Sequence, residues 1–154
     1  MRKTVYLLIL LLVWWPMIAQ DIRFDGGSYF LDDQLYTGLL VDYYDDGSTK
    51  SKLTIRNGLP NDSAIYFHIN GQLKTKGLFI DGRKHGKWTH WNESGAKIRE
   101  FHYNHGYKDG LWTVWYPNGQ LHFSMRYDLN ETVGTWESYL PNGELIKSKT
   151  YTRP

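Results

Sequence analysis

Apolar and polar positions recur along this chain at a fixed interval. The clearest copy is Gly110 to Tyr127, GLWTVWYPNGQLHFSMRY, in which two runs rich in Trp, Tyr, Phe and Thr flank a tight turn. Such a pattern is typical of a β-hairpin. The turn glycine belongs to a series spaced 24 residues apart, without insertion or deletion: Gly47, Gly71, Gly95, Gly119 and Gly143. This periodicity predicts an array of repeats in which these glycines are the structural turns.

The series divides residues 38–154 into full units at 38–61, 62–85, 86–109 and 110–133 and a truncated fifth at 134–154. A second turn joins successive units at Gly58, Gly82, Gly106 and Asn130, residue types that tolerate a left-handed backbone. We therefore predict an all-β fold, a single elongated, twisted antiparallel meander of five 24-residue β-hairpin repeats with open ends.

Residues 21–37 resemble a worn half-unit, because Tyr29 and Leu31 lie 24 residues before Leu53 and Ile55. An open array exposes an apolar face at its end unless an atypical unit covers it. We expect this segment to be an N-terminal capping half-repeat.

The turn sequences DDG, ING, ESG, PNG and PNG favour a three-residue loop with a bulge. Pro117 suits the first central position of a type I turn, Asn118 the second, and Gly119 the left-handed residue that follows. This loop places Trp115 opposite Leu121. The alternative, a two-residue Asn-Gly turn, would separate Trp115 from the apolar positions of the second strand.

With a regular ladder beyond the turn, one face of the fourth unit is expected to carry Thr113, Trp115, Phe123, Met125 and Tyr127. The equivalent sets are Val41, Tyr43, Leu53 and Ile55; Ile65, Phe67, Leu73 and Phe79; Trp91, Phe101 and Tyr103; and Tyr139, Leu145 and Tyr151. The opposite face is expected to be more polar. It would also carry one apolar column, consisting of Leu40, Ala64, Trp88, Trp112 and Trp136.

Residues 1–20 have the pattern of a signal peptide. Arg2 and Lys3 precede an apolar run from Val5 to Trp15, and Ala19 is a small residue suited to cleavage. An uncleaved anchor is the alternative, although the run is shorter than the ~20 apolar residues of a spanning helix. We expect an exported protein, periplasmic or secreted, that is soluble after cleavage.

Charge and cysteine content narrow the classes of partner. Removing Arg2 and Lys3 leaves 16 of the 18 basic residues against 16 acidic ones, so no basic surface for nucleic acid is indicated. The chain has no cysteine, which excludes disulfides and a lipid-modified N-terminal cysteine.

The repeated motif resembles MORN-type repeats, and more closely the bacterial MORN-variant repeats of proteins labelled YwqK-family antitoxins. The best copies are Gly110-Leu-Trp112-Thr-Val-Trp115-Tyr-Pro-Asn-Gly119-Gln-Leu121 and Gly134-Thr-Trp136-Glu-Ser-Tyr139-Leu-Pro-Asn-Gly143-Glu-Leu145. The resemblance implies an elongated, curled β-sheet with a scaffold or contact role, and MORN repeats are associated with protein partners and phospholipid surfaces. The second unit departs from the motif at Asp62 and Ala64, where we expect any ligand-binding face to be weakest.

Catalytic and metal chemistry are not indicated. His102 and His105 would point to opposite faces of a strand, and His85 and His105 fall in connecting loops. His90 and His102 could share a face, but no cysteine or fixed carboxylate spacing accompanies them. No nucleophile–base pair, carboxylate pair or phosphate-binding loop is present either. We expect a non-enzymatic protein with no cofactor and no metal.

The tryptophan column is the remaining candidate for a binding face. This face would comprise Trp88, Trp112, Trp136, His90, Tyr116 and His122. In the alternative, each tryptophan packs on the glycine-flanked backbone of its neighbour and holds the array together.

The leading function is a protein-binding or scaffold module of the cell envelope, with an unidentified protein partner. The alternatives are a toxin-neutralising antitoxin of the YwqK type and a module that binds cell-wall glycan or phospholipid, because aromatic side chains suit sugar rings and quaternary ammonium groups. Oligomeric state and pairing of the open sheet edges between chains stay open.

Overall fold

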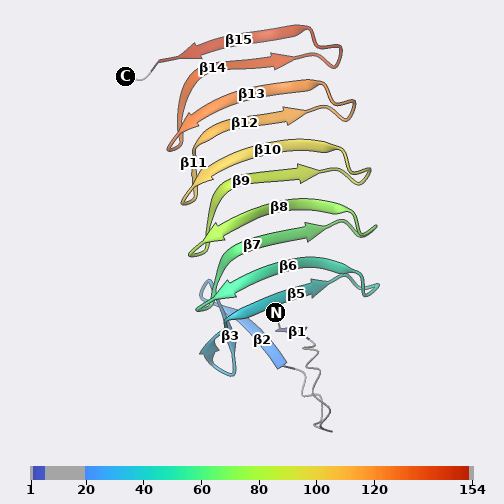
Figure 1. Cartoon of the computed structure of the whole chain (residues 1–154), viewed down its shortest axis with the longest axis vertical. Coiled ribbons are helices and arrows are strands. Elements are labelled where there is room, and N and C mark those ends of the chain that lie inside the picture. The colour runs from blue at the N-terminus through green and yellow to red at the C-terminus, as the bar shows by residue number, and fades with distance from the viewer. Residues whose placement is uncertain (1, 6–19, 153–154) are drawn as a thin grey trace.

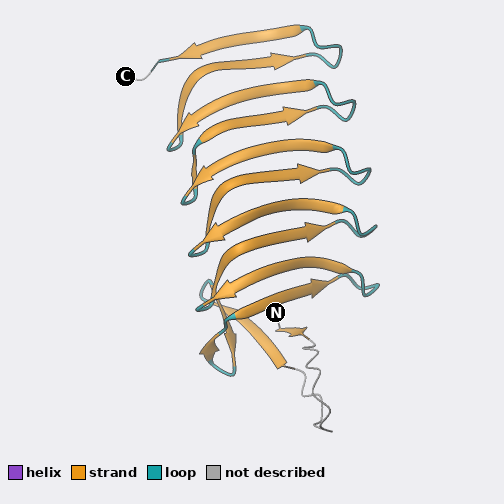
Figure 2. Cartoon of the chain, viewed as in Figure 1, coloured by secondary structure: helices purple, strands orange, loops and turns teal. Residues whose placement is uncertain are grey.

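The computed structural model describes residues 2–5 and 20–152, and within them it contains strands and no helix (Figures 1 and 2). Most of the apolar run of the predicted signal peptide, from Val5 to Trp15, lies outside these described residues. The prediction of an all-β chain is confirmed.

The repeats form one eleven-stranded antiparallel sheet whose strands follow one another in chain order (Figure 1). Its strands are β5 (Gly38–Tyr43), β6 (Thr49–Arg56), β7 (Leu59–Phe67), β8 (Leu73–Ile80), β9 (Arg83–Trp91), β10 (Lys97–Asn104), β11 (Tyr107–Lys108), β12 (Gly110–Trp115), β13 (Leu121–Asp128), β14 (Glu131–Tyr139) and β15 (Leu145–Tyr151). The short β11 pairs only with β10. The sheet is therefore the open meander of hairpins that the 24-residue period predicts.

A separate four-stranded sheet precedes the array. It contains β1 (Arg2–Val5), β2 (Gln20–Asp25), β3 (Ser28–Leu31) and β4 (Gln34–Leu35). Tyr29 and Leu31 lie in β3, so they do not continue the main sheet as a half-unit would. The two sheets share one apolar cluster, in which Ile22 and Tyr36 join Leu40, Leu53, Ile55, Ala64 and Trp88. The small sheet thus covers apolar side chains of the first repeats.

The turn geometry is as predicted. The amide of Gly119 donates to the carbonyl of Tyr116 at 2.9 Å, and the amide of Tyr116 donates to the carbonyl of Gln120 at 2.8 Å. Gly119 has a φ of 86°, in the left-handed region. Trp115 pairs with Leu121. The three-residue loop is therefore confirmed, and the same amide-to-carbonyl bond closes the turns at Gly47, Gly71, Gly95 and Gly143.

A bulge immediately after this pair overturns the predicted faces. Trp115 pairs with Leu121 but Val114 pairs with Phe123, so His122 is an extra residue on the second strand. The other hairpins have extra residues at the same position, namely Lys50, Lys74, Ile98 and Ile146. One extra residue moves every later side chain to the other face.

The predicted grouping of Thr113 and Trp115 with Phe123, Met125 and Tyr127 is consequently wrong. Trp112 pairs with Met125 and Val114 with Phe123, so the apolar positions of the second strand share a face with Trp112. The same correction divides the other predicted sets: Val41 and Tyr43 separate from Leu53 and Ile55; Ile65, Phe67 and Leu73 from Phe79; Trp91 from Phe101 and Tyr103; and Tyr139 and Leu145 from Tyr151.

We call the side that carries Leu40, Ala64, Trp88, Trp112 and Trp136 the core face. Trp88 is 2% exposed and packs edge-on against Phe79, with ring centroids 4.9 Å apart. Trp112 is 9% exposed and stacks on Phe101 at 4.1 Å. Aromatic pairs of this kind contribute about 0.5–1.5 kcal/mol beyond the area that they bury. The core of the array is therefore a stack of aromatic rings contributed by successive strands.

Hydrogen bonds between units set the spacing of the stack. At the connecting turns the amides of Gly58, Gly82, Gly106 and Asn130 donate to carbonyls 22 residues earlier, at Tyr36, Pro60, Lys84 and Lys108. At the hairpin ends the Tyr44 hydroxyl donates to the carbonyl of Phe67 at 2.8 Å, and the Tyr116 hydroxyl to that of Tyr139 at 3.0 Å. The first and second units are thus tied at both ends of their strands, and the fourth and fifth at the hairpin end.

Candidate functional site

The side opposite the tryptophan column, here called the open face, carries a second aromatic column. Trp112 and Trp115 are three residues apart on β12, so their side chains point to opposite faces. The open-face column consists of Tyr43, Phe67, Trp91, Trp115 and Tyr139, at the 24-residue interval. None of these five side chains is buried. They were predicted to be core residues, and the bulge is the reason that they are not.

Exposed aliphatic side chains accompany this column. Leu39 is 51% exposed, Leu111 44% and Leu145 51%, and all three lie on the open face by their pairing with Thr54, Arg126 and Tyr139. Exposed apolar groups that recur on one side of a protein mark contact surfaces. The open face is accordingly the better candidate for a docking surface.

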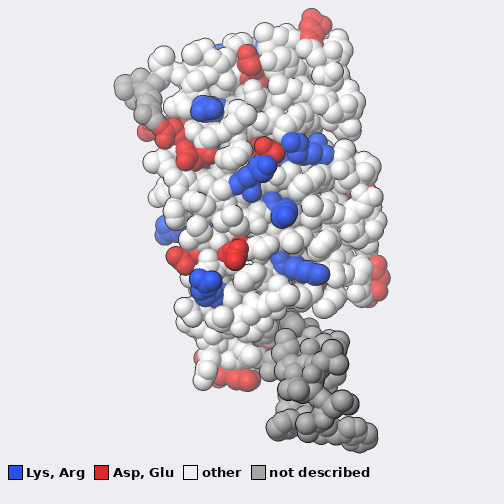
Figure 3. Space-filling model, viewed as in Figure 1, with Lys and Arg blue, Asp and Glu red and all other residues white. Residues whose placement is uncertain are grey.

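Lysines lie beside the open-face rings. The Lys97 Nζ is 4.3 Å from the ring centroid of Trp115, and the Lys52 Nζ is 6.0 Å from that of Phe67. Glu100 lies 3.2 Å from the Lys97 Nζ and 3.8 Å from that of Lys87. Figure 3 shows basic and acidic side chains interspersed along the middle of one side of the molecule. Exposed pairs of this kind contribute little stability, about 0–1 kcal/mol each, so they affect recognition more than folding.

Two of the three tryptophans predicted as a binding face, Trp88 and Trp112, are structural instead. The indole N–H of Trp88 donates to the carbonyl of Leu78 at 3.1 Å, and that of Trp112 to the carbonyl of His102 at 2.9 Å. A Cβ on Gly77 would overlap the indole of Trp88. Their placement on a polar face is wrong, and the alternative of a packed stack describes Trp88 and Trp112. Trp136, in the last unit, is partly exposed, and its indole N–H has no hydrogen-bond partner among residues 2–5 and 20–152.

The other predicted site residues fall at two separate places. Tyr116 and His122 stack with ring centroids 4.3 Å apart at the end of the fourth hairpin, where the Tyr116 hydroxyl ties that hairpin to the next. His90 lies one unit earlier, on β9, and shares a hydrogen bond with Thr75 at 2.9 Å. The six predicted residues therefore do not form one site.

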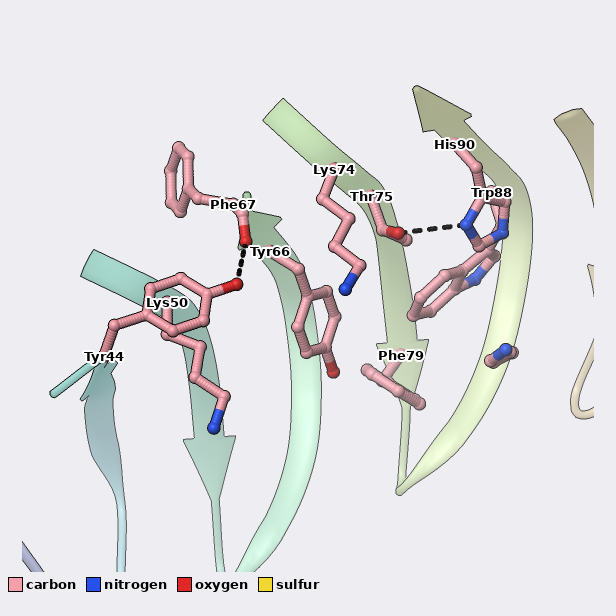
Figure 4. Close-up of a pocket in the computed structure, with 10 residues that line it drawn as sticks. Tyr44, Lys50, Tyr66, Phe67, Lys74, Thr75, Phe79, Trp88 and His90 are labelled. Carbon is pink, nitrogen blue, oxygen red and sulfur yellow. Dashed lines mark hydrogen bonds between the residues drawn. The ribbon is translucent and has the colours of Figure 1, made fainter. Parts of the chain in front are cut away.

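A pocket lies on the core face across β6 to β9, and we call it the core-face pocket (Figure 4). Its volume is about 270 Å³. Its lining comprises Tyr44, Lys50, Tyr66, Phe67, Lys74, Thr75, Phe79, Lys84, Trp88 and His90. The rings of Tyr44, Tyr66, Phe79 and Trp88 thus meet three lysines, Phe67 contributes its backbone carbonyl, and none of these described lining residues is acidic.

The cations of the pocket are held against its rings. The Lys84 Nζ lies 4.6 Å from the ring centroid of Trp88 and 5.2 Å from that of Tyr103. Burial lowers the pKa of Lys84. Burial, and then the positive charges of Lys84 and Arg99, lower the pKa of His90, so this imidazole is neutral at pH 7. Lys50 lies 3.6 Å from Asp42, which partly compensates its charge.

Sequence reasoning missed this pocket because it assumed a regular ladder. Lys50 and Lys74 are the extra residues of two bulges, and a bulge re-aims the side chain that it carries. The equivalent positions in later units are Ile98, His122 and Ile146. The one signal available was the pair of lysines 24 residues apart, immediately before the second strand's core positions.

No cluster of three or more potential metal ligands occurs in residues 2–5 and 20–152. The ring centroids of His85 and His105 are 4.7 Å apart. The sequence placed both residues in connecting loops, which is right for His105 but wrong for His85, since His85 lies in β9. In the same part of the chain, no helix has the length and apolarity needed to span a bilayer.

Part of the chain is similar to a known repeat family. Residues 84–105, 108–128 and 132–152 match the MORN repeat variant. These segments coincide with the three hairpins β9–β10, β12–β13 and β14–β15. The match indicates a repeat protein with a binding or scaffold role, and MORN repeats are generally not enzymes.

Other comparisons add little. A chain in the crystal structure of the GtfA/B complex bound to UDP and GlcNAc aligns with 12% identity and a TM-score of 0.28. The alignment covers 96% of this chain and 27% of that one, and a likeness this weak carries no argument about fold or function. No curated protein matches the sequence.

Proposed function

We propose that this protein is a non-enzymatic binding or scaffold module that docks another protein on its open face. The observation that carries the proposal is the aromatic column at Tyr43, Phe67, Trp91, Trp115 and Tyr139, flanked by exposed leucines. Tyr and Trp are enriched among the residues that dominate binding energy in protein interfaces. A column repeated over five hairpins would present several such anchors in a line.

The surrounding charges support a protein partner. Lysines and carboxylates alternate on the surface, and the chain without Arg2 and Lys3 has 16 residues of each sign. A mixed polar rim around an apolar centre is the usual anatomy of an interface between proteins. The repeat match supports a scaffold role in the same way, because stacked units form an extended surface on a rigid support.

Export to the periplasm or beyond is part of the proposal. It is supported by Arg2, Lys3 and the apolar run that follows them. Residues 1–20 fused to a reporter that is active only outside the cytoplasm should give activity, and substitution of Leu8 and Leu11 by Asp should abolish it. An inactive reporter fused to the unaltered residues 1–20 would overturn the proposal of export.

The test of docking begins with crosslinking of the purified chain to envelope extract, identification of the retained protein and reconstitution of the binary complex. The open-face variant Leu39→Glu/Leu111→Glu should weaken binding at least about tenfold, or ~1.4 kcal/mol. A matched control, Ile69→Glu/Leu129→Glu, places the same charges on residues that are 58% and 53% exposed in turns. Equal binding by the two variants, or the absence of any saturable partner, would overturn the proposal.

Antitoxin action is a second candidate, supported by the resemblance to MORN-variant repeats of YwqK-family proteins. A toxin would then be the protein that the open face binds. Co-expression should protect cells from that toxin, and Leu39→Glu/Leu111→Glu should remove the protection while the turn control keeps it. Protection that survives the open-face substitutions would separate antitoxin action from this surface.

A further inference from the structure

We infer that the core-face pocket binds a small organic anion, a ring that carries a carboxylate or a phosphate. The site lies on the side of the sheet opposite the proposed docking surface, so it is independent of the proposed function. Three lysines, Lys50, Lys74 and Lys84, line it from three different strands. The second unit, expected to be the weakest place for a ligand, is where this pocket lies.

The two lysines from the bulges give the pocket its charge. In a regular strand, successive side chains point to opposite faces of the sheet. Each bulge inserts one extra residue, and in these two hairpins the side chain of that residue lies on the core face. Figure 4 shows Lys74 extending between Tyr66 and Thr75, and Lys50 beside Tyr44. Lys50 is partly paired with Asp42, and Lys74 has no acidic neighbour among the described residues that line the pocket.

Lys84 adds a cation that has lost part of its water. Its Nζ is packed between the rings of Trp88 and Tyr103, and it is not exposed. An anion placed beside a partly desolvated ammonium recovers interaction energy that water no longer supplies. The equivalent lysine one unit later, Lys108, lies 4.8 Å from both Trp112 and Tyr127. Lys84 alone is therefore not what distinguishes the pocket.

The polar wall also distinguishes this place from the next unit. Thr75 and His90 share a hydrogen bond on the pocket wall. Twenty-four residues later the corresponding positions are Arg99 and Val114, and the bulge residue is Ile98 instead of Lys74. The same backbone thus carries hydroxyl, imidazole and ammonium groups in one unit, and a guanidinium with two aliphatic side chains in the next.

The volume of the pocket and its aromatic lining indicate the size and type of ligand that it can hold. A space of about 270 Å³ is at or just below the small end of ligand pockets, which typically measure roughly 300–1,000 Å³. It admits a single substituted ring and excludes a folded protein segment. Tyr44, Tyr66 and Phe79 provide the faces on which such a ring would pack.

Phenyl phosphate and benzoate are the probes for this inference, titrated against the full chain by tryptophan fluorescence and by calorimetry. Saturable binding is expected, with inorganic phosphate weaker because it lacks the ring and benzylamine without effect because it is a cation. Lys74→Gln and Lys84→Gln should each weaken binding about tenfold or more. Lys108→Gln is the matched control and should bind as the unaltered chain does.

The results of these titrations distinguish a small free anion from an anionic lipid headgroup as the ligand. If anionic phospholipid vesicles bind but phenyl phosphate and benzoate do not, the protein recognises a membrane surface and not a small anion. That result would overturn the inference. Equal loss in Lys74→Gln and Lys108→Gln would do the same, since it would indicate general charge attraction. Urea denaturation of each variant, with a midpoint unchanged for the exposed Lys74→Gln, establishes that weaker binding does not arise from unfolding.

Discussion

The indole of Trp88 lies directly against the backbone of Gly77, and a Cβ at Gly77 would come 2.7 Å from the Trp88 Cγ. The two residues face each other across the pairing of β8 and β9, where Gly77 occupies the position of Phe101 and Met125 in the later units. A side chain at this position would displace the best-buried ring of the array. Glycine is therefore required here for close approach, and its φ is not in the left-handed region.

Gly77→Ala should destabilise the protein by about 1–3 kcal/mol, the usual cost of overpacking a core. Urea denaturation monitored by circular dichroism would measure the change. In the background of Trp88→Leu the same substitution should cost much less, because the ring that it overlaps has gone. If the free-energy losses of the two substitutions simply add, the contact between Gly77 and Trp88 is not the cause of the destabilisation.

Gly119→Ala should be destabilising for a different reason. No atom lies within 4 Å of a Cβ at Gly119, but its φ of 86° is left-handed, which costs a non-glycine residue about 1–2 kcal/mol. Gly119→Asn should cost less, since asparagine tolerates this conformation. Thermal and urea unfolding of the two variants would give the order, and equal losses would argue against backbone strain.

The exchange of faces predicts opposite results for two tryptophans on β12. Trp112→Ala should cost about 3–5 kcal/mol, because it removes a buried ring and leaves a cavity beside Phe101. Trp115→Ala should cost clearly less, because Trp115 is partly exposed and its closest charged neighbour is an exposed lysine. Denaturation midpoints would decide between them. The regular ladder assumed from the sequence predicts the reverse order.

His90 predicts a dependence of stability on pH. Burial, Lys84 and Arg99 lower its pKa in the folded chain below the ordinary value of about 6.5 that it regains on unfolding. Between these two pKa values the unfolded chain binds more protons, so stability falls as the pH drops below about 6.5 and is unaffected above it. His90→Gln should reduce this loss. Urea midpoints at about pH 7.5 and 5.5 measure it, and the same loss in both proteins would exclude His90.

Several features followed from the sequence because they depend on neighbouring residues. The spacing of Gly119 and its equivalents predicted five hairpins, and Pro117-Asn118-Gly119 predicted the three-residue loop and the pairing of Trp115 with Leu121. Turn type is decided by the φ preferences of a few adjacent residues, so local sequence is sufficient. Which face of the sheet forms the core could not be predicted from neighbouring residues alone.

The tertiary structure decided which aromatic column is buried and where the cations gather. His122 and its equivalents have no residue type in common, so nothing local marks them as bulge residues. The bulge places Phe123, Met125 and Tyr127 beside Trp112 and puts Lys50 and Lys74 on the core face. The sequence by itself determined the repeat, its turns and its period. Which face of the sheet is buried was decided by packing between strands. Both aromatic columns are apolar in sequence, and they differ only in how well their side chains pack against those of the next unit.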